Sequence, residues 1–339
     1  MKKILFLVLA LCAFSAYSRA QSIDLMTATL QSGDKVSVYY GPDAFVSAYN
    51  AAADSGDVIT LSAGRFTSVT VKKSLTIVGN GYVDDAENGK YPTIIVGGLD
   101  FQPRDTIDGD GETISEAVGY DNTRVEGLRV SGSINLRGNR TVNNFSVVKC
   151  KCDNDIFLDA NTENITIRQS VVNRFHFNSD KVHNNFYIVG SHINDYYNAP
   201  NGTTSIDHSI LATNVPKGVT FTNSIASGLS EDIVAYNSIF MNNVSSHITG
   251  SGNWVDCKYA GIFEEEMTDL KWDGVKTFKL KYPSEYVGTD GTEVGFYGGP
   301  YPYNPTPTTP QIKESDIDTT VAEDGVLKVS VTVEAQTEN

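Results

Sequence analysis

The sequence predicts an all-β fold in which the chain winds into stacked coils of short strands. Three observations predict it: a short phrase recurs between residues 127 and 240, its copies are unevenly spaced, and its residue types suit strands joined by tight bends. The phrase is a turn-forming residue, an apolar residue, any residue, a second apolar residue, two further residues and a small one. Its seven copies begin at Gly127, Asn144, Asn164, Asn185, Thr203, Gly218 and Asp232.

The spacing of the copies favours strands over helices. The small residues that close the copies lie 17, 20, 21, 18, 15 and 14 positions apart, which is too irregular for a helical repeat. Within a copy, the two apolar residues lie two positions apart and so point to the same side of a strand. Stacking each coil on the one before it therefore predicts a shared apolar core.

The residue types at both ends of the phrase fit bends. Gly, Asn or Asp opens six of the seven copies, and these residues tolerate a positive φ or bond to their own backbone. Thr203 is the poorest fit. The closing Ser or Cys is expected where the next bend crowds the interior.

The region before the repeats predicts a short helix and further strands. Residues 43–53 carry apolar residues at helical spacing, and a helix there would cover the first coil. Residues 74–81 form an early copy of the phrase. Between 81 and 127 the pattern is blurred, and we expect coils around 94–96 and Ile114.

The first 20 residues have the parts of a secretory signal peptide. Two lysines precede an apolar run from Ile4 to Phe14, and Ser18-Arg19-Ala20 forms a small-x-small cleavage site. We therefore expect a secreted or cell-surface protein, with the periplasm as the alternative location. No later stretch reaches the ~20 apolar residues of a membrane span.

Charge limits the expected partners. The net charge is −15, and removal of Lys2, Lys3 and Arg19 leaves 23 basic against 41 acidic residues, a net charge of −18. Such a field repels nucleic acid, and it disfavours anionic polysaccharides unless Ca²⁺ bridges the two. Neutral glycans, peptides and other cell-surface components remain open as partners.

Several segments together resemble a known group of proteins. A helix is followed by GDVITLSAGRF at 56–66, SLTIVGNG at 74–81, the repeats, and GTDGTEVGFYGG at 288–299. This order resembles the secreted bacterial right-handed parallel β-helix proteins of the pectate-lyase-like superfamily. The resemblance implies that residues 21–299 form a single-stranded right-handed parallel β-helix with a short N-terminal capping helix. It leaves the activity open, because the superfamily includes lyases, hydrolases, esterases and adhesins.

The C-terminal region differs in composition from the repeats. Residues 300–311 are rich in Pro and Thr, which predicts a stiff linker. Residues 312–339 form a tail in which 325–334 alternates as one strand. We expect that strand to lie back along the coils; a sorting or partner-binding tail is the alternative.

A candidate binding face emerges when the coils are aligned on their small residues. Four positions later stand Arg174 and Asp195, and six positions later stand His176 and Tyr197. Aromatic rings stack on the C–H faces of sugars, and hydroxyl groups need nearby donors and acceptors. The expected ligand-binding residues are Asp155, Arg174, His176, His192, Asp195, Tyr196 and Tyr197. The alternative is an ordinary solvated outer face.

Ca²⁺ is the one cofactor that the sequence leaves open. Asp108, Asp110 and Glu112 could supply oxygen ligands from one loop. Counted from Asp108, the loop lacks the EF-hand glycine and the final glutamate, so a solvated acidic loop is the alternative.

Three functions follow from export, repeat architecture and charge. The first is non-catalytic binding of a glycan or surface component along the coil face. The second is a polysaccharide lyase or glycoside hydrolase using Arg174, His176 and Asp195. Against it, the repeats lack adjacent aspartates and a Gly-His-Gly motif, and no catalytic residue is assigned. The third is a structural module of a surface assembly, held through residues 300–339.

Overall fold

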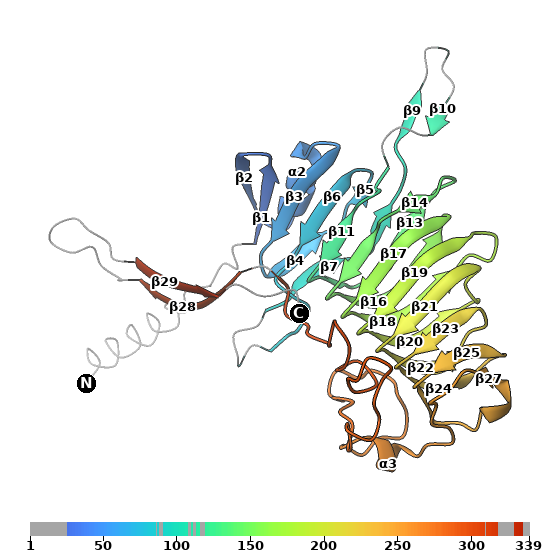
Figure 1. Ribbon diagram of the computed structural model, residues 1–339. Helices are drawn as coiled ribbons and strands as arrows, with labels where there is room; N and C mark the ends of the chain where they lie inside the picture. Colours follow the sequence, from blue (N-terminus) through green and yellow to red (C-terminus); the bar gives the residue numbers. More distant parts are fainter. Residues whose placement is uncertain are drawn as a thin grey trace, which may run out of the picture.

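The computed structural model describes residues 26–85, 87, 91–107, 110, 113–115, 119–308, 310–317 and 329–334. The predicted signal peptide and the calcium candidates Asp108 and Glu112 lie outside these residues. Two long sheets dominate the described chain, and the backbone passes from one to the other as it advances (Figure 1). The prediction of an all-β fold built from stacked parallel strands is therefore confirmed.

The first sheet is parallel from β3 onward and carries an antiparallel pair, β1 and β2, at its N-terminal edge. Its strands are β1 (Thr27–Ser32), β2 (Lys35–Tyr40), β3 (Ser55–Leu61), β6 (Ser74–Val78), β11 (Arg124–Glu126), β14 (Val142–Asn143), β15 (Ser146–Val148), β17 (Thr162–Arg168), β19 (His183–Val189), β21 (Gly202–Asp207), β23 (Val219–Thr222), β25 (Ile233–Tyr236) and β27 (Ile248–Thr249).

The second sheet is parallel throughout its described pairings. Its strands are β4 (Gly64–Thr67), β5 (Thr70–Val71), β7 (Thr93–Val96), β8 (Leu99–Phe101), β12 (Arg129–Val130), β13 (Ile134–Arg137), β16 (Lys151–Asp159), β18 (Val171–Phe177), β20 (His192–Tyr197), β22 (Ile210–Val215), β24 (Ile225–Leu229) and β26 (Ile239–Phe240). Strand β7 confirms the coil expected around 94–96.

The register confirms six of the seven repeat copies. The second apolar residues stack as one buried column, Val147, Ile167, Ile188, Ile206, Phe221 and Ala235. The copy at Gly127 is wrong, because Val125 pairs with Val147 and Val130 with Cys152. The coil in register with the one at Asn144 begins at Asn122, whose positive φ of 58° matches the 56° of Asn144, but it has Thr123 and Leu128 where the phrase has an apolar and a small residue.

The small residue of each copy builds a buried hydrogen-bond ladder. Ser191 Oγ accepts from Ser170 N at 3.1 Å and donates to Val189 O at 2.9 Å. The same pair of bonds recurs at Ser170, Ser209, Ser224 and Ser238. Each serine hydroxyl thus supplies the acceptor that a buried N–H on the neighbouring coil requires.

Both ends of the stack are covered. The expected helix is present as α2 (Ala44–Ala51), and its Phe45 and Ala48 are buried in the same core as Leu30. At the other end, residues 250–299, called here the C-terminal wrap, include α3 (Tyr259–Ile262) and follow the short helix η2 (Ser245–His247). Phe278 and Phe296 of the wrap anchor a second apolar cluster.

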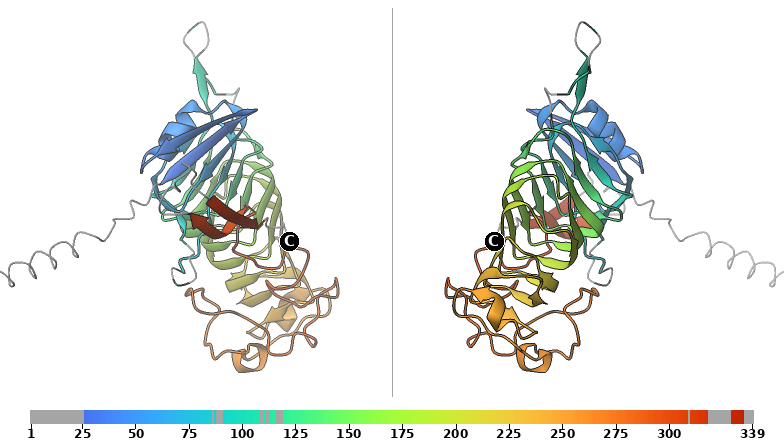
Figure 2. Two further views of the ribbon diagram at one scale, coloured as in Figure 1. Left: turned by 90° about the vertical axis from the view of Figure 1, so that its left-hand side faces the viewer. Right: turned by 90° about the vertical axis from the view of Figure 1, so that its right-hand side faces the viewer.

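One segment leaves the stack. Strands β9 (Asp105–Ile107) and β10 (Thr113–Ser115) pair antiparallel, and the hairpin projects from the coils in every view (Figures 1 and 2). The coil expected at Ile114 is therefore wrong. Its apolar residue belongs to a short local pairing and has no partner strand in the parallel sheets.

The predicted linker packs against the coils. Residues 300–308, called here the strap, cross the bends that precede the serine ladder. Gln169 Nε2 donates to Pro302 O at 2.7 Å, and Lys149 Nζ donates to Thr306 O at 2.8 Å. Glu126 Oε1 accepts from both N and Oγ1 of Thr308 at 2.7 Å. The strap thus ties several coils together along the stack.

The tail holds two strands where the sequence predicts one. Strand β29 (Val329–Glu334) pairs antiparallel with β28 (Gln311–Ile317), and this hairpin stands beside the stack (Figure 1). The expectation that the strand lies along the coils is wrong. The polar segment QIKESDI lacks the apolar alternation that would have revealed its partner.

Candidate functional site

Two rows of side chains cross the outer face of the second sheet. Arg174 pairs in register with Asp195, and His176 with Tyr197, as the alignment predicts. On β16 a bulge between Cys152 and Asp155 shifts the register by one residue, so Asp155 lies beside Arg174. The same shift places Phe157 beside His176, a residue that the sequence alignment missed.

The polar row contains a fixed cation. Arg174 Nε and Nη2 donate to the two oxygens of Asp155, each at 2.9 Å. These hydrogen bonds, with the charge of Asp155, raise the pKa of Arg174 above its usual value. Asp195 completes the row, and its Oδ1 accepts from Tyr196 N at 2.8 Å. The row therefore offers a guanidinium held in place between two carboxylates.

The aromatic row lies two residues further along the strands. The rings of Phe157 and His176 have centroids 4.3 Å apart, and those of His176 and Tyr197 lie 4.7 Å apart at 75°. Tyr197 is 55% exposed. The rings thus form a row of tilted and edge-on contacts, called here the aromatic platform, that reaches solvent at Tyr197.

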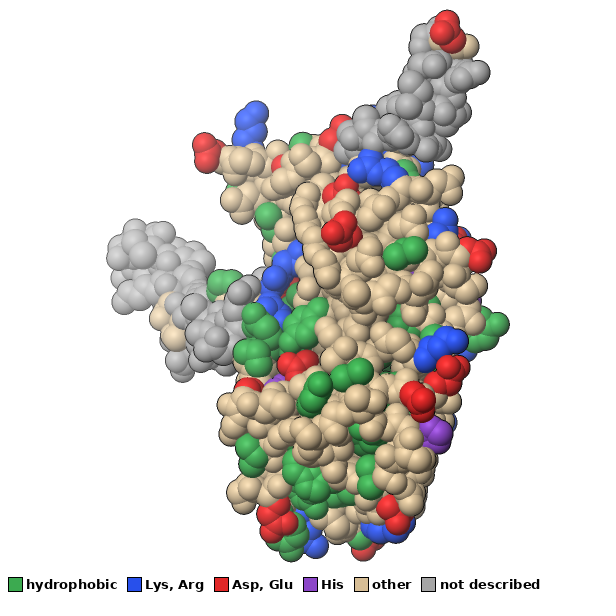
Figure 3. Space-filling model, turned by 45° about the vertical axis from the view of Figure 1, so that its right-hand side comes forward, with side chains coloured by type: hydrophobic (Ala, Val, Ile, Leu, Met, Phe, Trp, Pro, Cys, Tyr) green, Lys and Arg blue, Asp and Glu red, His purple; other side chains and the backbone are tan. Residues whose placement is uncertain are grey.

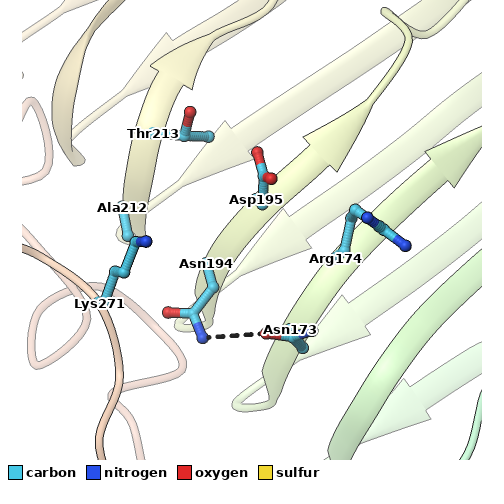
Figure 4. Close-up of a pocket in the computed structure, with 7 residues that line it drawn as sticks. All are labelled: Asn173, Arg174, Asn194, Asp195, Ala212, Thr213 and Lys271. Carbon is cyan, nitrogen blue, oxygen red and sulfur yellow. Dashed lines mark hydrogen bonds between the residues drawn. The ribbon is translucent and has the colours of Figure 1, made fainter.

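A hollow of about 290 Å³ lies beside the polar row (Figure 4). The residues that line it are Asn173, Arg174, Asn194, Asp195, Ala212, Thr213 and Lys271. Asn194 Nδ2 donates to Asn173 Oδ1 at 3.4 Å, and Asn194 Oδ1 accepts from Trp272 N at 2.7 Å. The second bond fixes the loop of the C-terminal wrap that brings Lys271 to the hollow. The sequence carries no repeat signal for that wall.

Two predicted site residues do not reach this face. His192 is fully buried among Trp272 and Phe278, with Nε2 2.7 Å from Leu270 O, and burial lowers its pKa to about 4. Tyr196 is half-buried and packs on the core, because strand alternation turns it away from Asp195 and Tyr197. His192 and Tyr196 are therefore removed from the candidate site.

The calcium candidates that the sequence offers are Asp108, Asp110 and Glu112. Of the calcium candidates only Asp110 is described, and it is exposed. No group of three His, Cys, Asp or Glu side chains within the described ranges could hold a metal ion.

Burial raises the pKa of the Cys150 and Cys152 thiols to about 12, so both act as small buried side chains. No helix in the described part of the chain is long and apolar enough to cross a membrane.

No known protein family, curated protein or solved structure matches this chain. The fold and the site together define an all-β protein of stacked parallel strands, with a polar hollow and an aromatic platform on one outer face.

Proposed function

We propose that this chain is a secreted or cell-surface protein that binds a glycan along the outer face of its second sheet without cleaving it. We assign the coils to the right-handed parallel β-helix of the pectate-lyase-like superfamily, on the resemblance of its sequence segments and on the parallel stacking of its strands. The observation that carries the proposal is the hollow of fixed polar groups beside an exposed aromatic platform.

The chemistry of this face suits a sugar. A pyranose presents C–H faces that pack on aromatic rings, and hydroxyl groups that each need donors and acceptors. The platform ends at the exposed ring of Tyr197, while Arg174, Asp195 and the paired amides of Asn173 and Asn194 supply donors and acceptors within the hollow. Because these groups are held by one another, a ligand would order few side chains on binding.

The direction of the rows favours an extended ligand. Both rows run across β16, β18 and β20, and neighbouring strands lie about 4.8 Å apart. A glycan chain lying along the stack would therefore meet a similar set of groups at each coil. On the face shown in Figure 3, acidic and basic side chains are scattered in small groups.

The same geometry argues against the lyase or hydrolase alternative. A lyase base must accept a proton, whereas the bond to Asp155 raises the pKa of Arg174 and holds it as a cation. Hydrolysis needs two carboxylates with separate roles, and Asp155 is already engaged by Arg174 on both oxygens. Of the two carboxylates in the polar row, Asp195 alone remains for acid or base work.

A glycan array with residues 21–339 tests the proposal. For a glycan that binds, Tyr197→Ala and Arg174→Ala should each weaken affinity at least tenfold without lowering the melting temperature by more than a few degrees. Tyr236→Ala is the matched control, because Tyr236 is a 39% exposed tyrosine on the first sheet. Binding that survives both variants would refute the site. Release of unsaturated or reducing ends, with or without Ca²⁺, would instead support the enzyme alternative.

The β28–β29 hairpin favours one second candidate, a structural module of a surface assembly. A two-stranded hairpin is marginally stable alone, so this one is suited to pairing with a further partner. Deleting residues 310–339 removes the hairpin and keeps the strap. Release of the truncated protein from producing cells would support the tether, and unchanged retention would contradict it.

A further inference from the structure

We propose that a second hollow, between the first sheet and the C-terminal wrap, binds a small ligand that carries hydroxyl groups and an ammonium group, such as an amino sugar. The hollow has a volume of about 320 Å³, near the lower end of small-molecule sites. Its walls come from β19, β21 and β23 and from residues 289–300, whereas the glycan face lies on β16, β18, β20 and β22. The inference therefore does not depend on the proposed glycan site.

Asp207 is the fixed acceptor of this second hollow. Tyr187 Oη donates to Asp207 Oδ2 at 3.1 Å, and Asn223 Nδ2 donates to Asp207 Oδ1 at 3.1 Å. The side chain of Asp207 is nonetheless 21% exposed. A carboxylate has about four acceptor positions, so these bonds leave capacity for donors on a ligand.

The wall opposite Asp207 belongs to the C-terminal wrap, and it is held by Asn223, which also bonds to Asp207. Asn223 Oδ1 accepts from Thr289 N at 2.8 Å, which holds the wrap against β23. Asp290 Oδ1 accepts from Thr292 N at 3.0 Å. Burial opposes ionisation of Asp290, but the hydrogen bonds from Thr292 and the electrostatic effect of His208 together outweigh it and hold its pKa below the usual value. Asp290 is therefore a carboxylate at neutral pH, and its side chain is 35% exposed.

A buried histidine joins the two acids. His208 is 1% exposed, with Nε2 3.1 Å from Thr292 Oγ1 and 3.5 Å from Asp290 Oδ1. Its Nδ1 lies 3.0 Å from Asp207 Oδ1, but the contact does not have the geometry of a hydrogen bond. His208 lines the hollow, and among the described residues its buried Nδ1 has no hydrogen-bond partner.

The charge of the hollow selects the ligand. The titratable groups that line it are Tyr187, Asp207, His208 and Asp290, and the described lining includes no lysine or arginine. Two acidic side chains therefore face a ligand with no lysine or arginine of the described lining beside them. An ammonium group gains a charge-assisted hydrogen bond there, whereas an anion is repelled. The half-buried ring of Tyr187 and the ring of Pro300 offer apolar surface to the C–H groups of the same ligand.

Calorimetric titration of residues 21–339 with glucosamine, N-acetylglucosamine and glucose tests the inference. Glucosamine should bind at least tenfold more tightly than the other two, which share its ring and lack its charge. Asp290→Asn should remove this preference, Asp290→Glu should retain it, and Glu231→Gln, a change at a 60% exposed acid elsewhere, should have no effect.

Each outcome of these experiments supports or overturns the inference of an ammonium-binding hollow. Equal affinity for glucosamine and glucose, or no binding of glucosamine at millimolar concentration, would overturn the inference. If Asp290→Asn unfolds the wrap, a crystal of the unaltered protein soaked in glucosamine provides the test instead. Electron density for glucosamine between Asp207 and Asp290 would support the site, and density only elsewhere would refute it. Loss of glycan binding through Tyr197→Ala with glucosamine binding intact would separate the two sites.

Discussion

Replacement of Ser191 by alanine tests whether the serine ladder holds the coils together. Ser191 is fully buried, and its hydroxyl is the acceptor for the N–H of Ser170 on the neighbouring coil. Its other partner, Val189 O, keeps a second bond from Gln169 N. The substitution therefore leaves one buried N–H without a partner, which costs about 1–3 kcal/mol.

We expect Ser191→Ala to lower the free energy of unfolding by about 2 kcal/mol, measured by urea denaturation at constant m-value. Ser191→Cys is the matched variant, because Cys150 occupies the same step of the ladder and its Sγ lies 3.2 Å from Val148 O. It should lose less than the alanine variant. Ser284→Ala, at an exposed serine of the wrap, should lose nothing measurable. A loss below 0.5 kcal/mol for Ser191→Ala would refute the ladder as a source of stability.

Two further predictions concern the strap and pH. Gly190 has a φ of 56°, and a methyl group there would overlap Tyr301 O of the strap, so Gly190→Ala should destabilise the protein by about 2 kcal/mol or more. Gly274→Ala is its control, since Gly274 also has a positive φ but open space around it; equal losses in the two would show that the strap yields freely. Burial lowers the pKa of His192 from 6.5 to about 4, so the folded state favours the neutral ring. The neutral ring therefore contributes its full stabilisation above pH 6.5, and the free energy of unfolding falls by about 3 kcal/mol as the pH drops to 4. His192→Gln should flatten that part of the pH profile in thermal melts. An unchanged profile would contradict the burial of His192.

The sequence predicted the coil register well where the phrase is regular. From Asn144 onward each copy has the second apolar residue and a small residue, and all but the copy at Thr203 have the first apolar residue too, so hydrophobic alternation leaves one acceptable register. At Gly127 it failed, because Gly127 itself adopts a φ of 64° and precedes Leu128, which stands where the coil that begins at Asn122 ends. Local patterns cannot separate two bends that lie five residues apart.

The candidate site was predicted in part for a similar reason. Arg174, His176, Asp195 and Tyr197 follow from alternation along two strands of equal register. Asp155 was also among the expected residues, but the bulge in β16 that brings it and Phe157 into the rows has no marker in the alignment. Lys271 and the burial of His192 depend on the C-terminal wrap, which returns to β20 from about 78 residues further along the chain.

The sequence by itself determined the stacked parallel coils, the helix at the N-terminal end and the part of the two rows that lies on β18 and β20, because each depends on periodicity within one coil or between neighbours. Only the tertiary structure decided where the strap, the C-terminal wrap and the tail hairpin lie. Their positions rest on contacts between distant residues, such as those of Glu126 with Thr308 and His192 with Leu270, and such contacts leave no period in the sequence. Both proposed binding hollows have a wall from the wrap, so the tertiary structure was needed to locate them.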